Sequence, residues 1–341
     1  MTANMTTEDV ILTLGGPDIA SLLQGKEREI IDRIGEAYVI HGTGDSSLPH
    51  SVFVRFPNRK RERIIALPGY LGGNKNIAGI KWIASFPENH SRDISRASAV
   101  MILNSMETGR PQAFMEGSII SAKRTAASAA LACDKLHVSD DIDTLGVIGC
   151  GLINREIVRF IASLRNIRSI VTFDISADRA ADWAESMREI VGDVPIEHTN
   201  VVTDLLARCP VVTFATTAVE PTINDLSMCP KGATLLHISL RDLTPQAILM
   251  GENIVDDVGH AMRAQTSTHL AEQIEGNRDF LHGTLAQILT GEIPPRDDPE
   301  AISIFSPFGL GVLDLTLGNF AYERALEQGI GTKITSFFDA T

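Results

Sequence analysis

Residues 142–176, IDTLGVIGCGLINREIVRFIASLRNIRSIVTFDIS, decide the fold of this chain. Their pattern predicts a strand, a glycine turn, a helix and a second strand that ends in an acid, Asp174. The acid follows the turn at about the 20-residue offset that is typical of a dinucleotide-binding βαβ unit. The stretch therefore predicts a Rossmann-type parallel sheet with a nicotinamide dinucleotide as its ligand.

The turn Gly149-Cys150-Gly151 has the residue types that a phosphate-binding turn requires. Gly149 permits a tight strand-to-helix turn, and Gly151 lets backbone N–H groups approach a pyrophosphate at the positive end of the next helix. Asn154 replaces the third glycine of the motif, which predicts a helix standing slightly off the sheet. Such a turn also occurs in other α/β proteins, and the flanking strands favour the dinucleotide here.

Asp174 also indicates which dinucleotide is bound. Its carboxylate can accept hydrogen bonds from the adenine-ribose hydroxyls, and its charge would repel the 2′-phosphate of NADP. This favours NAD as the cofactor. Arg179, five positions later, weakens that preference because a cation can accept the 2′-phosphate.

Composition limits the possible partners. The 341 residues carry a formal net charge of −13, which disfavours nucleic acids and anionic membranes and favours a small-molecule partner. No apolar run approaches the roughly 20 residues of a membrane span, and the start MTANMTTEDV lacks the layout of a signal peptide. We therefore expect a cytoplasmic protein that contacts neither nucleic acid nor membrane.

The sequence predicts neither a disulfide framework nor a bound metal. The cysteines are scattered without the CxxC spacing of a zinc site, so they are expected to be small buried residues. The histidines considered as metal ligands have no paired spacing. These residues are Cys133, Cys150, Cys209 and Cys229, and His50, His260 and His282.

Two domains are expected from the length and from a change in pattern along the chain. Residues 1–130 with 307–341 are predicted to form an α+β sheet domain. Within it, HSVFVRFP, RIIALPGYLGG and AGIKWIASF predict strands, and SAVMILNSMETGRPQAFMEG predicts a hairpin turning at Thr108-Gly109. The following SIISAKRTAASAALACDKL predicts a helix that bridges the two domains.

Residues 131–306 are predicted to form the NAD-binding domain, because strands and helices alternate as a doubly wound sheet requires. VVTFATT, ATLLHISL and NIVDD predict buried strands, ADRAADWAESMREIV a helix, and DFLHGTLAQILTGEIPP a helix and a proline turn. Ligands of such sheets bind at the carboxyl ends of strands, which favours Thr216, Ser239 and Asp242 as contacts. The last long helix, in 302–329, is expected to pack back on the first domain.

Several polar residues have both a functional and a structural interpretation. In the strand pattern Lys81 points either to solvent or into a site, and the pattern alone favours solvent. Arg124 is either a surface helix residue or an anion ligand, and Asp242 is either a helix cap or catalytic. His237 is expected to be a hydrogen-bonded core residue. Ser306 lies in FSPFG without a GxSxG motif, so it is not expected to be a hydrolase nucleophile.

Taken together, GIKWIASFP, ASAVMILNSMETGRP, SAKRTAASAALA, GVIGCGLIN, HISLRDLTP and SPFGLGVLDL resemble the ornithine cyclodeaminase and mu-crystallin family from about residue 48 to 322. Within it the chain looks most like the dehydrogenases of N-(2-amino-2-carboxyethyl)-L-glutamate, which serve 2,3-diaminopropionate biosynthesis. The resemblance implies an NAD-binding Rossmann domain and a substrate-binding sheet domain that is completed by the C-terminal helix. It also implies a homodimer formed through this sheet domain.

The resemblance also implies roles for individual residues. Lys81 matches a catalytic lysine that contacts the substrate α-carboxylate, and Asp242 matches the catalytic aspartate. Arg124 matches an arginine near that carboxylate and the cofactor phosphates, and Pro307 is expected to contact the substrate. The implied cofactor contacts are Arg124, Thr125, Gly149, Gly151, Leu152, Ile153, Asp174, Thr216, Ser239, Leu240 and Ser306.

Two positions depart from the family pattern. The family's early substrate-binding arginine does not align cleanly, and Arg55 is the best candidate, with His50 and Ser51 as alternatives. A cyclodeaminase lysine is replaced by Gln246, which disfavours ornithine cyclisation.

The resulting hypothesis is NAD-dependent oxidation of N-(2-amino-2-carboxyethyl)-L-glutamate, with hydrolysis to 2-oxoglutarate and L-2,3-diaminopropionate and release of NADH. The product would be a siderophore or nonribosomal peptide precursor. The alternatives are an ornithine cyclodeaminase, a ketimine reductase, an amino-acid dehydrogenase, or a binding protein that holds nicotinamide without turnover.

Overall fold

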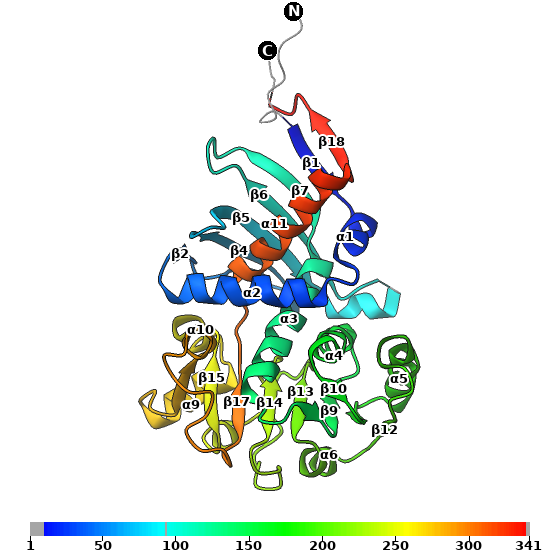
Figure 1. The fold of residues 1–341 in the computed structure, drawn as a ribbon, viewed down its shortest axis with the longest axis vertical. Coiled ribbons are helices and arrows are strands. Elements are labelled where there is room, and N and C mark those ends of the chain that lie inside the picture. The colour runs from blue at the N-terminus through cyan, green and yellow to red at the C-terminus, as the bar shows by residue number, and fades with distance from the viewer. Residues whose placement is uncertain (1–9, 93, 339–341) are drawn as a thin grey trace, which may run out of the picture. The chain divides into compact units, whose positions relative to one another are not determined.

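The computed structural model describes residues 10–92 and 94–338, and these fall into two compact units (Figure 1). The first unit contains the chain up to Arg124 and from Leu310 onward, and the second contains Thr125–Gly309. The sequence had suggested boundaries at 130 and 306. The division falls inside helix α3 (Ser118–Leu136), the helix predicted to join the two parts.

The first unit is built on an eight-stranded sheet of order β18-β1-β7-β6-β5-β4-β2, with β3 also paired to β4. Strands β3 to β7 are antiparallel, as predicted, and the β6–β7 hairpin turns at Gly109, whose φ is +74°. Strand β1 runs parallel to β7. The strands are β1 (Val10–Leu14), β2 (Ser46–Ser47), β3 (Val52–Phe56), β4 (Arg59–Leu71), β5 (Ile77–Ser85), β6 (Ala97–Asn104), β7 (Pro111–Glu116) and β18 (Thr332–Thr335).

Helices cover one face of this sheet. The C-terminal helix α11 (Gly311–Gln328) contacts β4, β5, β6 and helix α2, which confirms that it packs back on the first domain (Figure 1). Helices α1 (Gly16–Leu23) and α2 (Glu27–Gly42) were not predicted. The signal for α2 is present, because Ile30, Ile34 and Tyr38 recur at helical spacing and are buried.

Strand register decides which side chains of β5 share a face. Lys81 lies opposite Leu67 of β4 and Met101 of β6, on the face that contacts α11. Its neighbour Trp82 points to the other face and is 41% exposed. The sheet therefore has one covered face that contains Lys81 and one face with exposed apolar side chains.

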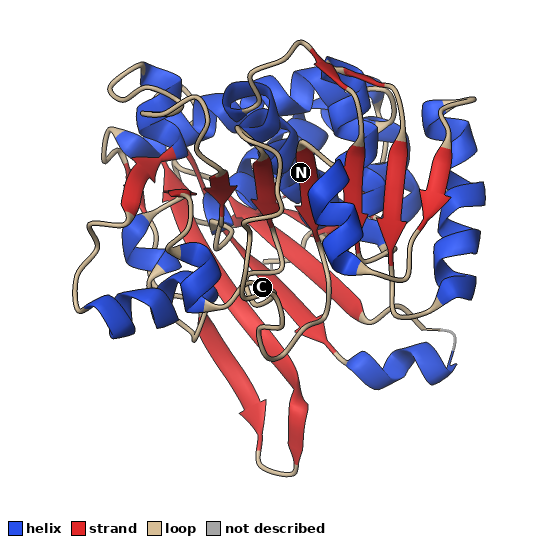
Figure 2. Cartoon of the chain, turned by 90° about the horizontal axis from the view of Figure 1, so that it is seen from below, coloured by secondary structure: helices blue, strands red, loops and turns tan. Residues whose placement is uncertain are grey.

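The second unit is a parallel sheet of order β12-β11-β9-β13-β14-β17-β15-β16, with its strands shown in red in Figure 2. The predicted doubly wound Rossmann fold with an α+β sheet domain is confirmed. The strands are β9 (Leu145–Ile148), β11 (Ile170–Phe173), β12 (Ile196–His198), β13 (Val211–Phe214), β14 (Thr234–His237), β15 (Glu252–Val255), β16 (Leu281–Thr284) and β17 (Ser303–Phe305). A separate pair joins β8 (Asp141–Ile142) to β10 (Asn166–Ile167).

Helix α5 of this unit has the range that the sequence predicts, whereas one other predicted helix is wrong in part. The segment 279–295 was predicted as a helix, but it contains β16 before α10, because Thr284 and Gln287 form a capping box that starts the helix there. The helices are α4 (Leu152–Leu164), α5 (Ala177–Val191), α6 (Val202–Arg208), α7 (Pro245–Ile248), α8 (Val258–Ala261), α9 (Ser267–Glu275) and α10 (Leu285–Thr290).

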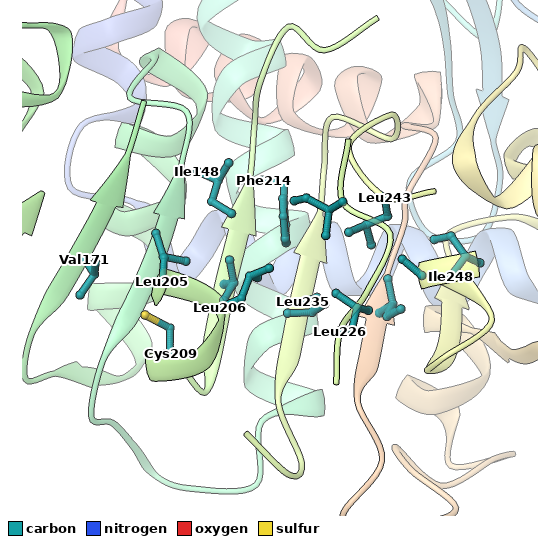
Figure 3. Packing of buried hydrophobic residues seen from close by; sticks show 14 of the residues in the cluster. Ile148, Val171, Leu205, Leu206, Cys209, Phe214, Leu226, Leu235, Leu243 and Ile248 are labelled. Atoms are coloured by element: carbon teal, nitrogen blue, oxygen red, sulfur yellow. The ribbon is translucent and has the colours of Figure 1, made fainter. Parts of the chain in front are cut away.

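Alternation along β13 shows that helices lie on both faces of the sheet. Val212 and Phe214 belong to a core cluster with Leu205 and Leu206 of α6 (Figure 3). Thr213, between them, points the opposite way and hydrogen-bonds to α4. The order of the strands reverses between β9 and β13, so the carboxyl ends of these strands form the topological switch point where ligands of such sheets bind.

No helix within the described residues is long and apolar enough to cross a membrane. Among the same residues, no group of three or more His, Cys, Asp or Glu side chains is placed to hold a metal ion. Cys133, Cys150 and Cys209 are buried and Cys229 is partly buried, which agrees with their interpretation as small packing residues.

Candidate active site

The turn after β9 has the geometry of a pyrophosphate cradle. Gly149 has a φ of +92°, and a Cβ there would lie 2.7 Å from the Ala215 carbonyl oxygen, so only glycine is tolerated. A Cβ on Gly151 would meet nothing within 4 Å, which leaves open space above the turn. Gly151 caps α4 without a side-chain hydrogen bond, so the N–H groups of Leu152 and Ile153 remain for an anion.

Asp174 is fixed beside this turn at the end of β11. Its Oδ2 accepts a hydrogen bond from the Cys150 backbone N–H at 2.8 Å, and its Oδ1 accepts one from the Ser176 N–H at 3.0 Å. Arg179 Nη1 lies 3.6 Å from Oδ1. A carboxylate held in this position next to an open glycine turn fits the ribose of a dinucleotide.

Asn154, which replaces the third motif glycine, is integrated into the turn. It is fully buried, and its Nδ2 donates to the carbonyl oxygens of Ile148 at 2.9 Å and Gly149 at 2.7 Å. Its Oδ1 accepts from Thr213 Oγ1 at 2.8 Å. The amide therefore bridges α4, the turn and β13, where a glycine would leave a gap.

We expect Asn154→Gly, which restores the motif glycine, to destabilise the protein by about 2–4 kcal/mol, because it leaves buried polar groups unpaired and adds helix flexibility. Urea unfolding followed by circular dichroism measures this loss. Asn166→Gly, at an exposed position of β10, is the matched control and should change stability by less than about 1 kcal/mol. Equal stability of Asn154→Gly and wild type would contradict the bridging role.

Asp242 lies in the loop after β14 and is 3% exposed. Its Oδ1 accepts from Thr216 Oγ1 and its Oδ2 accepts from Ser239 Oγ, so three predicted site residues meet here. The alternative interpretation of Asp242 as a helix cap is wrong, because Thr244 caps α7. Burial alone would raise the pKa of Asp242, but hydrogen bonds from His237, Ser239 and Thr216 outweigh it and lower the pKa.

His237 joins Asp242 to Ser306 and is fully buried, as expected for a hydrogen-bonded core histidine. The Asp242 backbone N–H lies 3.2 Å from its Nε2, which also lies 3.5 Å from Asp242 Oδ2, and Nδ1 pairs with Ser306 Oγ at 3.1 Å. Leu240, in the same loop, has a φ of +66°, and Ser267 donates twice to its carbonyl oxygen. The loop conformation is therefore held from several sides.

Asp256 is a buried residue of the second unit that was not predicted from the sequence. Its carboxylate accepts hydrogen bonds from the backbone N–H groups of Phe308 and Gly309, at 2.9 and 2.6 Å. Burial raises the pKa of Asp256 in spite of these bonds. The acid fixes the loop that contains Ser306 and the buried Pro307.

A second group of site residues lies in the first unit. Lys81 is 2% exposed, which shows that the interpretation favouring solvent is wrong. Its Nζ donates to Asp314 Oδ2 at 2.7 Å and to Ser121 Oγ at 3.2 Å, and Arg124 Nε donates to Asp314 Oδ1 at 3.0 Å. We call Lys81, Arg124 and Asp314 the cation cluster. Burial lowers the pKa of Lys81 to about 8, and Asp314 partly offsets this.

Asp314 was missed by the sequence analysis, although a lone acid in the apolar run GLGVLDLTLG is a detectable signal. Arg55 is exposed on β3 and lies opposite Arg63, which in turn lies opposite Ser85 of β5. Since Ser85 and Lys81 are an even number of residues apart, Arg55 is on the sheet face of Lys81. Thr125 is partly buried in α3, the first residue of the second unit.

Comparison with known proteins identifies relatives along nearly the whole chain. N-((2S)-2-amino-2-carboxyethyl)-L-glutamate dehydrogenase of Staphylococcus aureus is 30% identical over 334 residues, which cover 96% of this chain and 99% of that protein. The structure of Thermococcus litoralis Δ1-pyrroline-2-carboxylate reductase with NADH and L-proline superposes with a TM-score of 0.88 at 25% identity, covering 95% of this chain and all of that one. An archaeal alanine dehydrogenase dimer with bound NAD shares the fold, with a TM-score of 0.86 at 24% identity, over 96% of this chain and all of that one.

The fold, the glycine turn and these relatives define the protein as an NAD-dependent oxidoreductase. The ornithine cyclodeaminase/mu-crystallin family model matches residues 19–329. The chain belongs to this family.

Proposed function

We propose that the protein oxidises N-(2-amino-2-carboxyethyl)-L-glutamate with NAD and hydrolyses the product to 2-oxoglutarate and L-2,3-diaminopropionate. The observation that carries the substrate class is the cation cluster, in which buried Lys81 and partly buried Arg124 share the carboxylate of Asp314. Such a cluster suits the α-carboxylate of an amino acid. The specific substrate is supported by the similarity to the S. aureus dehydrogenase along almost the entire chain.

Each residue would have a distinct task. Lys81 and Arg124 would hold the glutamate α-carboxylate, and such positioning can supply roughly 7–11 kcal/mol of the barrier reduction. Asp242 would accept a proton from the secondary amine, or from the water that attacks the imine carbon. NAD+, when bound, supplies the hydride acceptor for the glutamate Cα hydrogen. Its pyrophosphate would lie on the N–H groups at Gly151.

Two further features favour this substrate over ornithine. Arg55 offers a second cation on the sheet face of Lys81, which suits a substrate with more than one carboxylate. Gln246 is exposed on α7 at the position of the cyclodeaminase lysine. The chain therefore lacks the lysine amine at this position.

The test is NADH absorbance with purified protein, NAD+ and N-(2-amino-2-carboxyethyl)-L-glutamate. The proposal expects one NADH and one 2-oxoglutarate for each substrate consumed. A cyclodeaminase would accumulate no NADH with ornithine, and a ketimine reductase would consume NADH with a cyclic imine. Cofactor binding without any of these changes would favour the binding protein.

Cofactor preference should reverse when Asp174 is replaced. We expect Asp174→Ser to improve NADP+ use relative to NAD+ by about 100-fold, because the repulsive carboxylate is lost and Arg179 remains to pair with the 2′-phosphate. The ratio of kcat/KM values for the two cofactors is the measurement. Asp178→Ser, an acid in the first turn of α5, is the control and should leave the ratio unchanged. An unchanged ratio in Asp174→Ser would remove Asp174 from cofactor selection.

The protein is further proposed to be a homodimer through the uncovered face of the first sheet. Val52, Val54, Trp82 and Phe114 share this face by register and are 61, 40, 41 and 44% exposed. Contiguous apolar side chains of this kind mark an interface. We expect Trp82→Glu to shift the mass measured by light scattering from dimer to monomer. A monomeric wild type, or a dimeric variant, would contradict this interface, and exposed Val138→Glu in the other unit is the control.

A further inference from the structure

The carboxylate of Asp314 connects the two cations of the first unit. It is fully buried on α11, and each of its oxygens holds a different cation, Lys81 at 2.7 Å and Arg124 at 3.0 Å. The carboxylate thereby sets the separation and orientation of the ammonium and the guanidinium. Neither cation is placed by packing alone.

These contacts leave hydrogen-bond donors on both cations. The Lys81 ammonium has three donors, and Asp314 and Ser121 accept two of them. Arg124 reaches Asp314 through Nε, so Asp314 does not engage the terminal amino groups of the guanidinium. A ligand carboxylate can accept from those groups and from Lys81 at the same time.

The charges of the cluster do not balance internally. Buried Lys81, partly buried Arg124 and one buried carboxylate leave one positive charge, and a single carboxylate from a ligand would neutralise it. Without Asp314, the two cations would repel each other at short range in a medium of low dielectric constant.

We propose that Asp314 is a positioning residue that holds Lys81 and Arg124 as a preassembled receptor for one carboxylate. The assignment of that carboxylate to the substrate rests on the proposed function, but the assembly of the receptor does not. Because Asp314 acts through the two cations, its loss should weaken carboxylate binding more than it slows the chemical step.

Binding of a carboxylate to this cluster should depend on pH through the protonation of Lys81. The charged groups that face Lys81 among the described residues are Asp314 from α11 and Arg124 from α3, and its strand partners Leu67 and Met101 are uncharged. Burial and Arg124 lower the pKa of Lys81, and Asp314 raises it, with a result of about 8. Binding should therefore weaken as the pH rises through about 8 in the wild type, and at a lower pH when Asp314 is neutral.

The test is Asp314→Asn in the full-length protein. We expect kcat/KM to fall about 100-fold, mostly through KM, and the alkaline limb of its pH profile to move down by about one pH unit or more. NADH affinity, measured by fluorescence titration, should stay within about twofold. Glu323→Gln removes an exposed acid of the same helix, 3.6 Å from Arg33, and should change none of these quantities.

A double-mutant cycle separates positioning from a structural role. In a Lys81→Gln background, Asp314→Asn should cost much less than in the wild type, whereas a structural contribution would add fully. If Asp314→Asn is not recovered folded, Asp314→Glu, which keeps the charge but moves it by one methylene, is measured in the same cycle. Additive losses with either variant would overturn the proposal.

One measurement needs no substrate and no turnover. An NMR titration of protein labelled with ¹³C-lysine, with Lys81 assigned by Lys81→Gln, should give Lys81 a pKa of about 8 in wild type and a lower pKa in Asp314→Asn. An unchanged Lys81 pKa would overturn the role of Asp314. Failure of wild type to form NADH with the expected substrate would overturn the proposed function alone.

Discussion

Asp242→Asn is expected to lower turnover by about 10²- to 10⁴-fold while NADH binding is retained. The carboxylate accepts hydrogen bonds from the Thr216 and Ser239 hydroxyls, and both hydroxyls can rotate to accept from an amide of the same shape. The variant should therefore keep its fold and lose only the group that accepts a proton. NADH formation under saturating substrate measures turnover, and fluorescence titration measures NADH affinity.

The control for this variant is Asp225→Asn, which changes an exposed acid in the same unit that bonds to Ser227. Its rate should equal that of wild type. The pH profile gives a second check, because hydrogen bonds hold the pKa of Asp242 below its usual range. Activity should therefore persist as the pH falls through the range in which an ordinary aspartate gains a proton, and should be lost only at lower pH, when this carboxylate is protonated. Wild-type turnover in Asp242→Asn would remove Asp242 from the mechanism.

Lys81→Met is expected to lower kcat/KM by about 1000-fold and also to reduce stability. The variant removes the buried ammonium that would contact the substrate carboxylate, and it leaves Arg124 as the remaining cation on Asp314. Removing one partner of a buried ion pair costs about 3–5 kcal/mol when the other charge is left uncompensated, and Arg124 should keep the loss toward the lower end. Steady-state kinetics and urea unfolding measure the two effects separately.

Lys26→Met is the matched control, because Lys26 makes a partly exposed ion pair with Glu29 at 3.5 Å. Such pairs contribute about 0–1 kcal/mol, so its stability and kcat/KM should remain close to wild type. NADH affinity should be unchanged in both variants. If Lys81→Met kept wild-type kcat/KM, the cation cluster could not be the substrate carboxylate site.

The elements that were predicted correctly have strong local signals. The strand–turn–helix–strand of residues 142–176, the helix at 118–136 and the hairpin at Gly109 follow from periodicity and turn chemistry within short windows. The segment 281–290 was misassigned because a short strand and a short helix share one apolar run. The boundary depends on the capping box at Thr284, whose signal is weaker than the run itself.

The candidate site was predicted only in part, because some of its residues are close in the sequence to their hydrogen-bond partners and others are far from them. Asp242 and Ser239 are neighbours in sequence, and Asp174 follows the glycine turn at a characteristic offset. Lys81 was assigned to solvent by pattern, since alternation gives the face of a strand but not what covers it. Its partner Asp314 lies 233 residues away on the helix that closes the first unit.

The amino-acid sequence by itself determined the parallel sheet, the glycine turn and the acid that follows it, because these depend on interactions between residues close in the chain. Only the tertiary structure decided that Lys81 is buried, that Asp314 holds Lys81 and Arg124 together, and that Thr216 and Ser239 hold Asp242. The physical reason is that the cost of burying a charge is offset only by a partner of opposite charge or by hydrogen bonds. For Lys81 that partner comes from a distant segment, so the sequence around Lys81 does not show that the two side chains meet.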